Sequence, residues 1–397
     1  MTRLEGRWTR DDRADSVYQY VPFEVPAGAR AVRVVLEYSG GVLDLGCFGP
    51  GGTFRGWSGG ARDRFVIAAD AATPGYLPGP VEAGEWHVAL GLHRVPADGM
   101  PYALTIETGD FGPDPLPAAP PAPDRPPRRE LPGIDGMRWY AGDLHTHTLH
   151  SDGALSLEGL AELVVRRGLD FCAVTDHNTV SHHPHLPGVG ARYGVALLPG
   201  QEVTTAYGHA NAFGDIGWVD FRQPADEWLA HAAGNGGLLS VNHPLGGDCC
   251  WRQPMTGKPH LAEVWHWSWL APNWGGPLAW WEAAGRDITP VGGSDWHRPG
   301  DDMPPGEPTT WVLATDAGPD AILAGLHAGR TAISADRAAP LLLRLGDEFL
   351  ALDADGSLLV SPEGRRTPVR GARATLPAAP GPHLLETPDG ARVALCG

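Results

Sequence analysis

Apolar and polar positions follow two different patterns along the chain. Between residues 15 and 108, short runs rich in β-branched and aromatic residues are separated by glycine and proline turns, with no helical stretches between them. This pattern is typical of antiparallel strands. The predicted strands are 17–25, 31–38, 43–48, 64–69, 86–92 and 102–107. Their spacing predicts an N-terminal β-sandwich or jelly-roll module over residues 1–110.

The pattern changes after a proline-rich segment. Nine prolines between Pro113 and Pro132 predict a stiff, extended linker over residues 111–135. Apolar runs then alternate with amphipathic helices, the first of which has Ser156 as a plausible N-cap and Gly168 where a C-cap belongs. This alternation predicts a parallel barrel or an open parallel sheet over residues 136–335. The predicted strands are 139–144, 171–175, 195–198, 238–241, 288–291 and 310–313, and the predicted helices are 157–167, 225–233, 278–284 and 321–327. Strand-like runs return from Pro340 onward and predict a small β appendage over residues 336–397.

Polar clusters follow the ends of the predicted strands in this second region. The first cluster contains His145 and His147, which point the same way on an extended backbone and can therefore bind one metal ion. Asp152, past the next turn, can reach the same cavity. Four further clusters also follow apolar runs, and they contain Asp176 with His177, Glu202 with His209, His243, and Asp295 with His297. Because active sites of barrels and parallel sheets lie at the carboxyl ends of the strands, these clusters are expected to converge.

The composition supports a metal site and argues against several other classes. Thirteen of the 17 histidines fall between His145 and His297. The five cysteines are odd in number and irregularly spaced, which argues against a disulfide framework or a thiolate zinc module. A net charge of −17 opposes a general role in binding nucleic acid or an anionic membrane. No apolar run is long enough to span a membrane, and a cytoplasmic location is the default expectation.

These motifs resemble the signature blocks of the PHP (polymerase and histidinol phosphatase) superfamily, and the surrounding sequence resembles its CehA/McbA-like branch of metallohydrolases. The resemblance covers residues 139–334 and implies a distorted βα barrel of about seven strands. It implies that His145, His147, Glu202 and Asp295 bind a first metal ion. A second would be bound by Glu202 as a bridge with His209 and His243, and a third by Asp152, His177 and His297. Asp152 departs from the all-histidine third site of some relatives.

The ligand types and the resemblance together predict a metal-dependent hydrolase. Histidine and carboxylate ligands without thiolates suit two or three ions of manganese, iron or zinc. Such ions turn a bound water into the nucleophile. Their charge would exceed that of the ligand carboxylates, which favours an anionic substrate. We expect the residues active in catalysis to be Glu202, Asp295, His297 and Asp176.

Two substrate classes are compatible with this ligand set. The leading prediction is a phosphoesterase that hydrolyses a small-molecule phosphate mono- or diester. The alternative is a carbamate or carboxylic-ester hydrolase that uses the same metals to polarise a carbonyl group. A tryptophan-rich stretch from Trp251 to Trp281, which includes Trp267 and Trp269, is a candidate wall for a ring-bearing leaving group. The candidate substrate-binding residues are Arg298, Arg192, Lys258 and His182.

Overall fold

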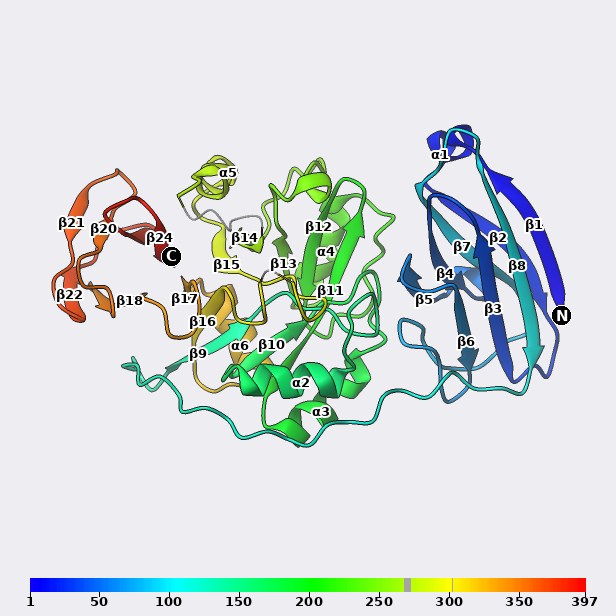
Figure 1. Cartoon of the computed structure of the whole chain (residues 1–397), viewed down its shortest axis with the longest axis horizontal. Coiled ribbons are helices and arrows are strands. Elements are labelled where there is room, and N and C mark those ends of the chain that lie inside the picture. The colour runs from blue at the N-terminus through cyan, green and yellow to red at the C-terminus, as the bar shows by residue number, and fades with distance from the viewer. Residues whose placement is uncertain (268–272, 302) are drawn as a thin grey trace. The chain divides into compact units, whose positions relative to one another are not determined.

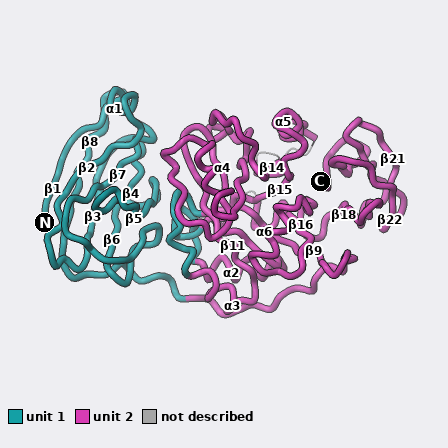
Figure 2. The backbone as a smooth tube through the Cα atoms, turned by 180° about the vertical axis from the view of Figure 1, so that it is seen from behind, with its two compact units in different colours: residues 1–118, 148–156, 176–184 teal, residues 119–147, 157–175, 185–397 magenta. Residues whose placement is uncertain are grey.

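The chain forms a mixed α/β fold with one large sheet and few helices (Figure 1). The computed structural model describes residues 1–267, 273–301 and 303–397. These residues divide into two compact units, which Figure 2 shows in different colours. The first unit consists of residues 1–118 together with the loops 148–156 and 176–184. The second unit consists of residues 119–147, 157–175 and 185–397.

The first unit is built from antiparallel strands. Its elements are β1 (Thr2–Trp8), α1 (Arg10–Asp15), β2 (Tyr18–Val25), β3 (Ala31–Tyr38), β4 (Val42–Phe48), η1 (Pro50–Gly52), β5 (Phe54–Gly59), β6 (Arg64–Ala68), β7 (Gly84–Arg94) and β8 (Met100–Gly109). The strands form two four-stranded sheets, in the orders β1-β8-β3-β6 and β2-β7-β4-β5. Apolar side chains of both sheets, such as Val34 and Leu45, share one hydrophobic core. All six strands predicted in this region form, and β1 and β5 are additional.

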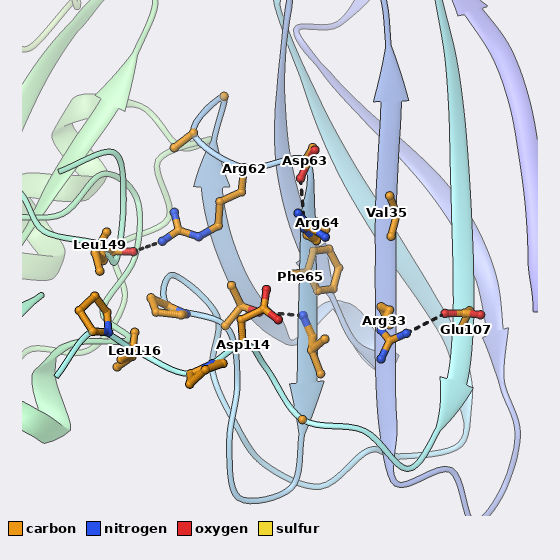
Figure 3. A pocket seen from close by; sticks show the side chains of 18 of the residues that line it. Arg33, Val35, Arg62, Asp63, Arg64, Phe65, Glu107, Asp114, Leu116 and Leu149 are labelled. Atoms are coloured by element: carbon orange, nitrogen blue, oxygen red, sulfur yellow. Dashed lines mark hydrogen bonds and ion pairs between the residues drawn. The ribbon is translucent and has the colours of Figure 1, made fainter. Parts of the chain in front are cut away.

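Two loops from the second half of the chain belong to the first unit because strands of that unit hold them. The guanidinium group of Arg62 donates hydrogen bonds to the carbonyl oxygen of Leu149 (Figure 3) and to that of Ser151. The N–H of Gly75 donates to Ser181 Oγ at 3.0 Å, and the hydroxyl of Thr179 donates to the carbonyl of Gly75 at 2.8 Å. Loops 148–156 and 176–184 are therefore fixed by partners that lie far away in the sequence.

The first unit contains a cavity of about 880 Å³, and Figure 3 draws the side chains that line it. Arg33, Arg62, Glu107, Asp114 and Leu149 contribute to its lining. Arg33 already pairs with Glu107 at 3.2 Å, and Arg62 is bound to the loop carbonyls. None of the predicted metal ligands is among the described residues that line this cavity.

The second unit begins with alternating strands and helices. Its elements up to residue 334 are β9 (Arg138–Asp143), α2 (Leu157–Arg166), β10 (Phe171–Val174), η2 (His183–His185), α3 (Leu186–Tyr193), β11 (Ala196–Thr205), β12 (Gly208–Phe213), α4 (Ala225–Gly234), β13 (Leu238–Val241), η3 (Gly247–Cys249), β14 (Leu261–Trp265), α5 (Gly276–Ala284), β15 (Thr289–Gly292), β16 (Thr309–Ala314), α6 (Pro319–His327) and β17 (Thr331–Ser334). In α2, Leu157, Leu160, Ala161, Val164 and Val165 are buried, which is the apolar face expected of an amphipathic helix. None of the helices in the described parts of the chain is long and apolar enough to cross a membrane.

One sheet runs through the second unit and sets the position of the predicted motifs. Its first eight strands lie in the order β15-β14-β13-β12-β11-β10-β9-β16. Strands β9, β10 and β11 are parallel, β13, β14 and β15 are parallel, and β11 and β12 form an antiparallel hairpin. Thr310 on β16 joins the two ends of this run, because its hydroxyl exchanges hydrogen bonds of 2.8 Å with the N–H and the carbonyl of Gly292 on β15.

The C-terminal strands continue this sheet. They are β18 (Leu341–Leu345), β19 (Glu348–Leu352), β20 (Leu358–Val360), β21 (Arg366–Pro368), β22 (Arg373–Pro377), β23 (His383–Glu386) and β24 (Arg392–Cys396). The sheet order runs on from β16 through β17-β24-β23-β20-β21, and β18, β19 and β22 form a separate sheet. The predicted boundary at residue 335 therefore does not separate two compact units, because β24 pairs with β17 and both lie in the second unit.

Candidate metal centre

The ends of β9 and β15 bring the first and fifth motifs together. Beyond these strands the two segments stay paired. The N–H of His147 donates to the carbonyl of Trp296, and the N–H of Asp295 donates to the carbonyl of His145. As a result, Asp295 Oδ1 lies 3.2 Å from His145 Nε2 and 3.1 Å from His147 Nε2. These three side chains present ligand atoms within 4.8 Å of one another, which is a spacing that suits a single cation.

The Glu202 carboxylate lies where the third and fourth motifs meet the first. It lies on β11, and Oε1 is 3.1 Å from His209 Nδ1 on the neighbouring β12. The same oxygen is 3.2 Å from His243 Nε2, beyond β13, and 3.2 Å from His145 Nε2. Asn242 fixes the carboxylate by donating to Oε1 at 3.0 Å. His145, Glu202 and His243 form a second group of ligand atoms within 4.8 Å.

The geometry of His145 fits a bound cation better than a hydrogen bond. Its ring is fully buried, and Nε2 makes no hydrogen bond of good geometry to any described residue. Yet Glu202 Oε1 and Asp295 Oδ1 each lie 3.2 Å from this nitrogen. A buried nitrogen without a hydrogen-bond partner is unfavourable unless another group satisfies it. A divalent cation between the nitrogen and the two carboxylates would do so.

The charges in the centre depend on one another. Burial raises the pKa of Asp295, but the facing imidazole groups of His145, His147 and His243 lower it by more, so it lies well below its usual range. Burial lowers the pKa of His145, but the carboxylates of Glu263, Asp295 and Glu202 raise it well above its usual value. Asp295 is therefore ionised and ready to bind a cation at neutral pH.

Two of the ligands have unusual backbone conformations. His243 has a φ of 24° and Asp295 a φ of 55°, in the left-handed region that residues other than glycine rarely adopt. Such conformations persist only where the surrounding structure holds them, and they cluster at functional sites. Here they turn both side chains towards Glu202 or His145 directly after a strand ends.

The residues predicted for a third metal ion lie in two pairs. Asp152 and His177 approach each other at 3.5 Å in the first unit. In the second unit, His297 stacks on His147 with 4.1 Å between ring centroids, and its Nδ1–H donates to the carbonyl of Asp295 at 2.7 Å. Because the two pairs belong to different units, the third site stays a prediction.

Asp176, predicted to be catalytic, anchors a loop. It is fully buried, and its carboxylate accepts hydrogen bonds from the N–H and the hydroxyl of Thr148 at 2.8 and 2.7 Å and from Ser151 at 2.6 Å. Burial raises its pKa, and these hydrogen bonds oppose the rise. The contacts of Asp176 connect loop 176–184 to the loop that carries Asp152.

The four predicted substrate-binding residues contact partners in different parts of the chain, and their role stays a prediction. Arg298 is exposed, and its N–H donates to Asp301 at 2.8 Å. Arg192 lies over the ring of its neighbour Tyr193, and Lys258 pairs with Asp287 at 2.7 Å on the surface. His182 is fully buried, with Nδ1 3.5 Å from Asp176 Oδ2.

The tryptophans between Trp251 and Trp281 have different surroundings. Trp265 and Trp281 are buried and belong to the hydrophobic core, and Trp274 is 44% exposed. The ring of Trp267 lies 6.2 Å from that of His243, so this tryptophan is a candidate for the expected apolar wall. Trp269 lies outside the described residues.

Sequence reasoning missed two buried carboxylates. Glu263 lies on β14, which was not predicted, and contacts the ring of His145 and the backbone of His243 at 2.7 and 2.9 Å. Asp143, at the end of β9, accepts hydrogen bonds from the backbone N–H groups of His145 and Ser294 at 3.0 and 3.1 Å. The available signal was the position of each acid inside or at the end of an apolar run, as in Leu-Ala-Glu-Val-Trp.

Comparisons with known proteins give partial similarities. No family model matches the chain. The 5'-3' exoribonuclease Rnm of Salmonella typhimurium is 39% identical over 67 residues, which are 16% of this chain and 23% of that protein. The chain thus matches less than a quarter of this curated relative. A two-domain protein from Bacteroides vulgatus, described as containing a predicted PHP-like metal-dependent phosphoesterase, is 19% identical with a TM-score of 0.43, over 68% of this chain and 99% of that one. An amidohydrolase from Chromobacterium violaceum is 18% identical with a TM-score of 0.31, over 41% of this chain and 89% of that one. By their names, the three proteins are hydrolases.

Proposed function

We propose that this protein is a metal-dependent phosphoesterase of the PHP superfamily that hydrolyses a phosphate mono- or diester of a small molecule. The observation that carries the proposal is the position of Glu202. One buried carboxylate oxygen lies 3.1–3.2 Å from imidazole nitrogens of three separate motifs, those of His145, His209 and His243. A carboxylate among histidines is the arrangement expected of a ligand that bridges two cations.

The described residues fit two cations directly. His145, His147 and Asp295 would hold one, and Glu202, His243 and His209 would hold the other. Because the ligands are nitrogen and oxygen atoms, manganese, iron and zinc all suit them. When bound, such ions supply Lewis acidity and lower the pKa of water.

The exposure of the proposed ligands indicates the side from which a substrate would approach. His145, His147 and Glu202 are fully buried, whereas Asp295 and His209 are each 15% exposed and mark the open side. The hydrogen bond from His297 Nδ1–H to the Asp295 carbonyl leaves Nε2 as the basic nitrogen of that ring. It is the group placed to hold or pass on a proton at the open side.

The fold supports the same proposal. The proposed ligands follow strands β9, β13 and β15 or lie on the hairpin of β11 and β12, and the Thr310 hydroxyl joins β15 to β16. We infer a distorted βα barrel with the ligands at the carboxyl ends of its strands, preceded by a β-sandwich. This is where barrel enzymes carry their active sites.

The proposal is tested first by metal content. We expect purified protein to carry at least two transition-metal equivalents per chain by elemental analysis. If the protein carries less than one equivalent and shows no metal-dependent activity after reconstitution, the proposal that it is a metal-dependent enzyme is wrong.

A substrate panel then separates the candidate reactions. It contains an aryl phosphate, a bis-aryl phosphate, a dinucleotide, an aryl methylcarbamate and an aryl acetate, each assayed with and without chelator. We expect chelator-sensitive turnover of the phosphate esters, and the dinucleotide shows whether the substrates extend towards the type that the name of the Salmonella relative suggests. Turnover restricted to the carbamate or the acetate would establish the alternative hydrolase instead.

A further inference from the structure

Glu263 contacts two of the proposed ligands from behind. It lies on β14, is 1% exposed, and each of its carboxylate oxygens has a different partner. Oε1 is 2.7 Å from His145 Nδ1, and Oε2 accepts the backbone N–H of His243 at 2.9 Å. A single side chain therefore connects the first histidine motif to the fourth.

The contact with His145 fixes the identity of the ring nitrogens. Because Glu263 Oε1 faces Nδ1, this nitrogen keeps its proton when a cation is bound, and Nε2 then presents its lone pair to the opposite side. On that side lie Glu202 and Asp295, both 3.2 Å from Nε2. Carboxylates that hold a histidine ring in this way orient the ring for a cation and make it a stronger ligand.

The fifth motif provides the space for this contact. A Cβ atom on Gly293 would lie 2.5 Å from Glu263 Oε1 and 2.6 Å from the Cβ of His145. Both distances are far shorter than a normal contact between non-bonded atoms. Glycine at position 293 thus allows the carboxylate and the imidazole to meet directly behind the site.

We propose that Glu263 is a positioning residue of the metal centre, which sets the tautomer of His145 and the backbone of His243 and so keeps both ligands aimed at the same point. This proposal rests on the proposed function, since it concerns the affinity of that site for a cation. Glu263 does not contact the reacting atoms. Its effect reaches them through two ligands that belong to different strands.

The experiment measures the affinity of Glu263→Gln for Co²⁺ and Mn²⁺ by competition with a chelator. A glutamine amide can accept from His145 or from His243, but its NH₂ group then faces the other donor. We expect the affinity to fall by about 10- to 100-fold. We also expect the visible absorption of bound Co²⁺ to change, because the direction of one ligand changes. Glu263→Asp keeps the charge but shortens the side chain by about 1.5 Å, and we expect a loss of at least about tenfold.

Glu386→Gln is the matched control. Glu386 is a buried carboxylate of the same unit, 5% exposed, and its ion-pair partners are Arg366 and Arg392 rather than a ligand. This variant should lower the melting temperature of the chelator-treated protein but leave the Co²⁺ spectrum and affinity as in the wild type. A purely structural role of Glu263 would give the same result as the control.

The outcomes separate the two proposals. Wild-type protein that binds no cation would overturn the proposed function and this inference with it. Wild-type protein that binds cations, with unchanged affinity and spectrum in Glu263→Gln, would overturn this inference alone. If Glu263→Gln does not fold, the same criteria apply to Glu263→Asp.

Discussion

Glu202 stands out among the individual residues because its carboxylate is shared by the motifs that converge on it. Glu202→Gln keeps the shape of the side chain but removes its charge. It should lower the metal content below that of the wild type and reduce kcat/KM on a phosphate ester by about 10²-fold or more, close to 3 kcal/mol of transition-state stabilisation. Elemental analysis and steady-state kinetics measure both effects.

Gln201 provides the comparison for this substitution. It is the preceding residue, and its amide exchanges hydrogen bonds with the backbone of Val219 instead of contacting a ligand. Gln201→Glu should therefore alter stability more than metal content. Wild-type metal content and turnover in Glu202→Gln would show that this carboxylate bridges nothing.

Asp44 gives a prediction about pH in the first unit. Burial raises its pKa to about 7, although the nearby charge of His177 opposes the rise. An aspartate has a pKa of about 3.9 in the unfolded chain, so the folded state binds the proton more tightly. Its contribution to stability is therefore full below about pH 4 and is lost as the pH rises towards 7.

Asp44→Asn removes this titration and tests it. The melting temperature of the wild type, relative to that of Asp44→Asn, should fall between pH 4 and pH 7 and stay level above that range. Asp63→Asn serves as the reference, because Asp63 is a largely exposed carboxylate of the same unit. Parallel melting curves for wild type and Asp44→Asn across this range would contradict the prediction.

Candidate metal ligands could be proposed from the sequence because their spacing is local. His145 and His147, like Asp295 and His297, are two residues apart, and an extended backbone turns both members of such a pair the same way. Glu263 could not be predicted in this manner. Its role depends on two partners that are 118 and 20 residues away, and nothing in its immediate neighbours indicates them.

Single structural elements explain which strands the sequence pattern recovered. β10 and β13 are fully buried apolar runs, so the pattern predicted both. β12 and β14 were missed because polar or acidic residues interrupt them, namely His209 and Asn211 in β12 and Glu263 in β14. In both strands the interrupting residue lies at or behind the metal centre. The apolar pattern of these two strands is therefore interrupted at residues of the proposed metal centre.

The loop 148–156 should lose order when Arg62 is removed. The side chain of Arg62 donates to two carbonyl groups of this loop, and hydrogen bonds from charged donors contribute about 1.5–3 kcal/mol each. Arg62→Ala should speed amide hydrogen exchange in the loop by about tenfold or more. Hydrogen exchange followed by mass spectrometry resolves this segment.

Arg64→Ala is the control for this prediction. Arg64 follows Arg62 closely, but it is largely exposed and its ion-pair partner is the neighbouring Asp63 at 3.5 Å. The loop should keep wild-type protection in this variant. Equal exchange in Arg62→Ala and Arg64→Ala would mean that the loop is held by its own contacts, above all those of Asp176.

For the whole molecule, the predicted linear domains differ from the compact units. Sequence patterns divide a chain at composition changes, such as the proline-rich segment, and cannot show that two later loops pack with an earlier module. The structure places 148–156 and 176–184 with the first unit, together with Asp152 and His177. The first unit thus holds two segments that carry predicted ligands. The sequence did not indicate this role, because residues 1–110 contain no ligand cluster of their own.

A fragment that begins at residue 119 tests this division. It keeps Arg125 and Arg128, which bind Leu169 and Asp170 in the second unit. It should still bind cations through His145, Glu202 and Asp295, which contact one another within that unit. The two loops should exchange amide hydrogens faster than in the full chain, since Arg62 and Gly75 are gone. Unchanged exchange, or loss of all cation binding by a folded fragment, would contradict the expectation.

The position of β24 has a consequence for how the protein is synthesised. This strand is formed by residues 392–396 yet lies between β17 and β23, inside the large sheet. Residues 392–396 are translated after both neighbouring strands, so the nascent chain exposes two unpaired strand edges until this segment is made. Unpaired edges promote association between chains. A stop codon placed directly before Arg392 should therefore send most of the product into inclusion bodies, although every proposed metal ligand has been translated.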